Sequence, residues 1–82
     1  MRRAYRQIIA GRASVADTII ALYRKGAVKH RFSASEIEHL LTGVFSDSEI
    51  RHELAGMVGH YHAIPPDKRF RELEKYRYEI VD

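Results

Sequence analysis

The chain has 82 residues, of which 45% are hydrophobic, and its formal net charge is +3. A chain of this length supports one domain with one small core, and its apolar share excludes an intrinsically disordered protein. Cysteine is absent, which excludes disulfides, a thiolate nucleophile and a cysteine-ligated zinc finger.

Residues 1–12 carry four arginines and no acidic residue. Tyr5, Ile8 and Ile9 recur at helical spacing before Gly11, which predicts a short basic helix or arm. This apolar stripe either covers the core or pairs with a second copy, so homodimerisation through the segment is a hypothesis. Neither this segment nor any other holds the apolar run of a signal peptide or a membrane span, and we expect a cytoplasmic protein without a membrane partner.

A helix from Ser14 to Lys25 is indicated by signals at both ends. Ser14 is suited to an N-cap, Asp17 places a negative charge in the first turn, and Gly26 is suited to the position after the last turn. The expected apolar face of this helix consists of Val15, Ile19, Leu22 and Tyr23.

An internal repeat of thirteen residues follows, in which Phe32–Val44 matches Phe45–Met57 at eight positions. Each copy opens with a phenylalanine, a serine and, three residues after the serine, a glutamate, which predicts a hydrophobic staple and a capping box at a helix start. The two boxes are Ser33 with Glu36 and Ser46 with Glu49. Helix starts of this kind also converge by chance, and two units are too few for a solenoid, so we infer no duplication.

The repeat predicts two helices joined by a short turn, which is the outline of a helix-turn-helix. The first helix, Ala34–Leu41, ends before Gly43, whereas the second occupies Asp47–His60. Short side chains and glycines, among them Gly56 and Gly59, occupy one face of the second helix. That face permits either the close approach of a partner or close packing on another element of the same chain.

A change of period marks the C-terminal region, residues 61–82. Tyr61–Ile64 is compatible with a short strand, Pro65–Pro66 excludes a helical continuation, and Tyr76–Val81 alternates as a half-buried strand does. Residues 67–75 are strongly charged and are interpreted as either an extended loop or a single helical turn. We expect the two strands to pair as a hairpin that has this charged segment at its tip.

The order of these elements resembles that of winged helix-turn-helix domains, in which a helix and a short strand precede the helix-turn-helix and a two-stranded wing follows it. The resemblance covers about residues 14–82 and rests on element order. It implies a strand at Val28–Phe32, a three-helix core within residues 14–60 and a wing over residues 61–82, with residues 1–12 as an added helix or arm. We therefore expect a single α+β, mainly helical winged helix-turn-helix domain.

By this resemblance, the chain is expected to bind double-stranded DNA sequence-specifically, as a small transcriptional regulator associated with the nucleoid. The second helix of the repeat would lie in the major groove. The expected base-reading residues are Ser48, Arg51, His52 and Ala55. Arg51 is the candidate for guanine, because a guanidinium fits the O6 and N7 acceptors. Phosphate contacts are expected from Arg2, Arg3, Lys29, Arg31, Lys68, Arg69 and Arg71, of which the last three are expected at the wing tip.

Acidic residues are unusually frequent in the expected helix-turn-helix. Glu36 and Glu49 are explained by capping, but Glu38 and Glu53 must point away from the DNA, or else the domain uses another face. The alternative function is therefore a winged-helix protein-interaction module whose acidic helix-turn-helix face binds a protein partner.

The five histidines lack the spacing of a metal site, and no glycine-rich phosphate loop, nucleophile elbow or isolated pair of acids indicates catalysis. A chain of this length also has little room for a buried pocket. We therefore expect no enzyme activity and no metal, cofactor or small-molecule substrate.

Overall fold

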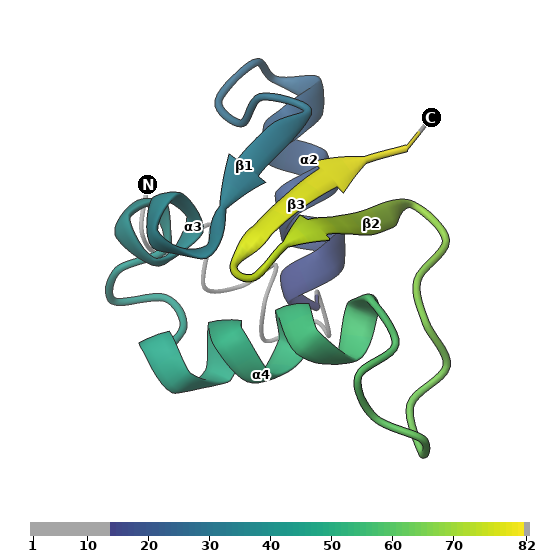
Figure 1. Ribbon diagram of the computed structural model, residues 1–82. Coiled ribbons are helices and arrows are strands. Elements are labelled where there is room, and N and C mark those ends of the chain that lie inside the picture. The colour runs from purple at the N-terminus through teal and green to yellow at the C-terminus, as the bar shows by residue number, and fades with distance from the viewer. Residues whose placement is uncertain (1–13, 82) are drawn as a thin grey trace.

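A computed structural model describes residues 14–81 of the protein (Figure 1). Within this range three helices and a three-stranded antiparallel sheet form an α+β fold, which confirms the expected class. The elements are α2 (Val15–Arg24), β1 (Arg31–Ser33), α3 (Ala34–Leu40), α4 (Asp47–Met57), β2 (Phe70–Glu74) and β3 (Arg77–Ile80). The helix or arm expected over residues 1–12 lies outside the described residues.

Helix α2 begins and ends as its sequence predicts. The Ser14 hydroxyl accepts a hydrogen bond from the Asp17 backbone N–H at 3.0 Å, and Gly26 takes a φ of 82° just beyond the helix. The left-handed backbone region is open to glycine because it has no Cβ to clash. The buried residues of α2 are Val15, Ala16, Thr18, Ile19 and Ile20, whereas the expected core residues Leu22 and Tyr23 are only partly buried.

Helices α3 and α4 both start with a complete capping box. Ser33 Oγ accepts from the Glu36 N–H at 3.2 Å while Glu36 Oε1 accepts from the Ser33 N–H at 2.7 Å. Ser46 and Glu49 repeat the arrangement at 3.1 and 3.3 Å. Each box satisfies amide groups that have no partner inside the helix. Both predicted capping boxes are therefore confirmed.

Helix α4 ends at Met57, earlier than the predicted His60, because Gly59 turns the chain with a φ of 90°. Its inner side presents Ile50 and Leu54, both fully buried, to the core. Gly56 is also buried, and a Cβ built on it would lie 3.4 Å from Ile64 and 3.6 Å from Tyr61. The sequence allowed either the close approach of a partner or close packing within the chain at Gly56, and the structure supports packing within the chain.

The sheet has the strand order β1-β3-β2, so that the last strand lies in the middle (Figure 1). Phe32 pairs in register with Tyr78 and Phe70 with Ile80, and these four buried side chains line the inner face. The Phe32 ring stacks on Tyr78 at a centroid distance of 5.7 Å and meets Phe70 edge-on at 6.3 Å. The first strand lies at Arg31–Ser33 rather than Val28–Phe32, although Val28 is buried as a core residue.

The hairpin is built differently from the prediction. Tyr61–Ile64 forms turns and no strand, whereas Phe70–Glu74, expected within a charged loop or helical turn, forms β2. Two adjacent prolines prevent regular pairing near residue 64, and the buried Phe70 ring fixes the strand further on. A two-residue turn at Lys75 and Tyr76 joins β2 to β3, so the hairpin has a short tip.

Candidate nucleic-acid interface

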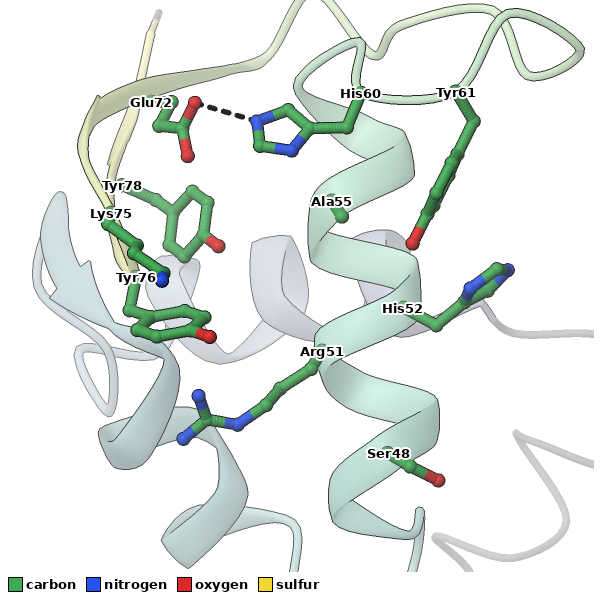
Figure 2. Close-up of a pocket in the computed structure, with 10 residues that line it drawn as sticks. All are labelled: Ser48, Arg51, His52, Ala55, His60, Tyr61, Glu72, Lys75, Tyr76 and Tyr78. Atoms are coloured by element: carbon green, nitrogen blue, oxygen red, sulfur yellow. Dashed lines mark hydrogen bonds and ion pairs between the residues drawn. The ribbon is translucent and has the colours of Figure 1, made fainter.

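A groove of about 480 Å³ runs between α4 and the β2–β3 hairpin (Figure 2). All four expected base-reading residues, Ser48, Arg51, His52 and Ala55, line it. Six further residues complete the lining, namely His60, Tyr61, Glu72, Lys75, Tyr76 and Tyr78. We call this feature the α4 groove.

Helical geometry explains why the four α4 residues share one side of the helix. They recur at steps of three and four positions, which place side chains one above another on a helix. The fully buried Ile50 and Leu54 fix the opposite side against the core. In Figure 2 Ala55 lies between the longer side chains of Arg51 and His60. Its short side chain allows another molecule to approach the helix backbone.

Arg51 is held from two sides. Its Nε donates a hydrogen bond to the Glu38 carboxylate of α3, and its guanidinium carbon lies 4.6 Å from the centre of the Tyr76 ring. The hydrogen bond to Glu38 is the main cause that raises the pKa of Arg51 above its ordinary value. The Arg51 side chain remains 38% exposed, so it is both oriented and accessible.

Tyr76 occupies the hairpin tip with a φ of 66°, the left-handed region that costs a non-glycine residue about 1–2 kcal/mol. Its carbonyl accepts a hydrogen bond from the Ala34 N–H at 2.9 Å, which ties the tip to the start of α3. The Lys75 ammonium lies 5.2 Å from the same ring. Tight hairpin turns commonly require a residue with a positive φ, so this conformation follows from the short connection between β2 and β3. It also leaves the Tyr76 ring exposed beside a cation.

Two contacts close the other end of the α4 groove. The His52 ring stacks on Tyr61 at a centroid distance of 4.8 Å, and His60 Nε2 lies 2.8 Å from Glu72 Oε1. The second contact joins the segment after α4 to β2, as the dashed line in Figure 2 shows. The placement of the His52 ring therefore depends on Tyr61, and Figure 2 shows it on the side of α4 away from the hairpin.

The expected phosphate-binding residues are not gathered at the wing tip. Arg31 and Arg71 both bind the Glu79 carboxylate on the sheet, with Arg31 Nε at 3.1 Å. Arg69 binds Asp67 at 2.7 Å and Asp17 at 3.0 Å, before β2 begins. The placement of Lys68, Arg69 and Arg71 at the tip was therefore wrong, because the tip consists of Lys75 and Tyr76. Lys29 and Lys68 are exposed, and Arg2 and Arg3 lie outside the described residues.

Sequence reasoning missed three of the residues that shape the site, Glu38, Lys75 and Tyr76. Glu38 was regarded as an unexplained acid, since no local pattern links it to Arg51 thirteen positions later. Lys75 and Tyr76 were placed inside or beside a long charged tip. The alternation of Tyr78 and Ile80 with charged residues did indicate β3. The predicted strand, Tyr76–Val81, began one residue too early, however, and so put Tyr76 inside the strand rather than in the turn before it.

Among residues 14–81, no three histidine, aspartate or glutamate side chains converge as a metal site requires. In the same part of the chain no helix is both long and apolar enough to cross a bilayer. Comparison of the chain with protein-family models, curated proteins and solved structures finds no match.

Proposed function

We propose that this chain is a winged helix-turn-helix protein that binds double-stranded DNA sequence-specifically, as a small transcriptional regulator. One observation carries the proposal: the exposed side of α4, with Ser48, Arg51, His52 and Ala55, lines a groove bounded by a lysine and a tyrosine at the hairpin tip. In this assignment α4 is the recognition helix and the β2–β3 hairpin is the wing.

The dimensions of α4 support this role. Its 11 residues span about 16 Å, and a B-DNA major groove about 12 Å wide admits such a helix. Figure 1 shows α4 along one border of the molecule, with the sheet and α2 on its other side. The oriented Arg51 would contact guanine, and the short Ala55 would let the helix enter deeply.

The acidic residues are compatible with the proposal. Glu36 and Glu49 are engaged in capping boxes, and Glu38 is paired with Arg51. Glu53 faces a separate hollow next to Met57, on the side of α4 away from the hairpin tip. Glu38 is thus neutralised by Arg51, the expected base-reading arginine, and Glu53 lies outside the α4 groove.

Protein binding by the same surface is the second candidate. It is favoured by the exposed aromatic and aliphatic side chains around the hairpin, since Tyr61, Leu73 and Tyr76 keep 38%, 43% and 46% of their surface exposed. Tyrosines are enriched in protein interfaces as well as in sites that stack on bases. A protein partner would not require the steep salt dependence that phosphate contacts impose.

The test begins with selection of a binding site from random duplexes, followed by titration of the selected and an unrelated duplex at several salt concentrations. Arg51→Ala should lower affinity for the selected site about 10-fold, within the range of one bidentate base contact, and change affinity for the unrelated duplex little. Arg24→Ala is the matched control, because it removes the same charge from the exposed end of α2 outside the groove. Absence of binding at low salt would contradict the proposal and favour a protein partner.

A further inference from the structure

Three elements converge on the guanidinium of Arg51. Glu38 comes from α3, Arg51 from α4 and Tyr76 from the hairpin tip, so the arrangement exists only in the folded chain. The hydrogen bond from the Ala34 N–H to the Tyr76 carbonyl holds the tip against α3, which fixes two of the three side chains relative to each other. The Glu38 side chain is only 15% exposed, so solvent competes weakly for its oxygens.

The way in which Glu38 binds Arg51 determines what the guanidinium can still do. Arginine has five N–H donors, one on Nε and two on each terminal nitrogen. Because Nε donates to Glu38, the terminal nitrogens keep donors for a second planar acceptor. The Tyr76 ring, 4.6 Å from the guanidinium carbon, restricts the tilt of the plane. A guanine edge, with O6 and N7 side by side, matches a pair of terminal donors.

A purely stabilising ion pair explains this geometry less well. Glu38 is largely covered, yet the Arg51 side chain keeps 38% of its surface exposed, so the pair leaves part of the guanidinium accessible. A pair that served stability alone would not need the Tyr76 ring beside that accessible group. Charge alone does not explain it either, since neutralising a base-reading arginine lowers its attraction for DNA. This loss of attraction is understandable if the benefit of the Glu38 pair is a fixed orientation of Arg51.

We propose that Glu38 is a positioning residue that fixes Arg51 for end-on reading of one guanine, so that the DNA site contains a guanine opposite the first half of α4. This inference rests on the proposed DNA binding. It assigns a role to the acid that is least expected in a DNA-reading helix pair. The energy of the Arg51–guanine contact, which contributes both to affinity for the selected site and to discrimination at that guanine, would then depend on Glu38.

The experiment uses the full chain and the duplex that it selects. Each guanine of that duplex is replaced in turn by 7-deazaguanine, which keeps the base pair and lacks the N7 acceptor. The wild-type protein should lose about 10-fold in affinity at one guanine. Glu38→Ala should lower affinity for the unmodified site and lose less than 2- to 3-fold on the same replacement, because the oriented contact is already absent. Glu38→Gln should restore part of the discrimination, since its amide oxygen still accepts the Nε–H.

The control is Glu53→Ala, which removes the same charge from α4 without touching Arg51. It should keep the full wild-type response to 7-deazaguanine. The Arg51 Nε–H resonance in an NMR spectrum of the free proteins checks the contact directly and should shift in Glu38→Ala but not in Glu53→Ala. Wild-type sensitivity in Glu38→Ala, or a selected site without a sensitive guanine, would overturn the positioning role alone. Failure to select any site would overturn the proposed function together with it.

Discussion

Glu79 is a carboxylate with only 7% of its surface exposed, placed between two arginines from neighbouring strands. Hydrogen bonds from Arg71 and then from Arg31 hold the pKa of this carboxyl below its ordinary value of 4.5. Arg69 likewise lowers the pKa of Asp67 below 3.8. In both cases the folded protein binds a proton less readily than the unfolded chain does.

From these directions the pH dependence of stability follows. A carboxyl group whose pKa is lower in the folded protein than in the unfolded chain stabilises the folded protein at pH values above the unfolded pKa. This stabilisation is lost as the pH falls through the folded pKa. The free energy of unfolding should therefore decline as the pH falls below about 4.5. Urea unfolding followed by circular dichroism at a series of pH values measures this decline. Glu79→Gln should be less stable near neutral pH and have a shallower acid decline, whereas a variant of the exposed Glu74, Glu74→Gln, should retain the wild-type profile.

At the scale of elements, the two glycines near the end of α4 serve different purposes. Gly56 lies within the helix, where alanine is favoured by about 1 kcal/mol, and a Cβ there would make contacts of 3.4 Å and longer with flexible side chains. Gly59 has a φ of 90°, where a Cβ is strained. Gly56→Ala should thus leave stability unchanged or raise it by up to about 1 kcal/mol. Gly59→Ala should lower it by about 1–2 kcal/mol. Thermal unfolding of both variants provides the comparison, and equal losses would contradict the distinction.

The three helices could be predicted from the sequence, whereas strand β2 could not. Capping boxes and helical spacing are local, so α2, α3 and α4 follow from neighbouring residues. Strand β2 has a bulge between Glu72 and Glu74, which breaks the two-residue alternation and puts the apolar Phe70 and Leu73 at a helical spacing. The pattern therefore suited a helical turn, although Leu73 is exposed and Phe70 is buried.

For the site, periodicity was sufficient to bring the four α4 residues together but not to find their neighbours. Ser48, Arg51, His52 and Ala55 share a helix face whatever the rest of the chain does. Glu38 and Tyr76 reach Arg51 only because α3 and the hairpin tip dock beside α4. Contacts of that kind depend on tertiary packing, and no regular spacing in the sequence predicts them.

On the scale of the whole molecule, the net positive charge is concentrated in the first twelve residues. Within residues 14–81 the acidic and basic residues balance, and the four arginines of residues 1–12 account for the net positive charge. The described part measures 32 × 27 × 21 Å, so in the proposed complex one copy would cover about one turn of DNA, roughly 34–36 Å. Non-specific attraction is therefore expected to come mainly from the arginines that precede α2, and base discrimination from α4.

Homodimerisation through residues 1–12 remains a prediction at this scale. A two-fold dimer would present two copies of α4 to successive turns of the major groove and would require a palindromic site. Sedimentation velocity should then give twice the 9.5 kDa chain mass at working concentration. A monomeric mass, together with a selected site that lacks symmetry, would contradict the dimer.

The position of the last strand in the middle of the sheet has a consequence for the order of folding. Strands β1 and β2 do not pair with each other, and the bond from Arg31 to Glu79 joins residues 48 positions apart. During synthesis the helices can form while the chain is still growing, but the sheet has to wait for residues 77–80, because such distant pairings close slowly and late. Tyr76 reaches Arg51 at that same step. The arrangement of Glu38, Arg51 and Tyr76 is therefore complete only after the β2–β3 hairpin has formed, so the proposed reading of DNA by Arg51 would depend on late, long-range pairing rather than on the helices alone.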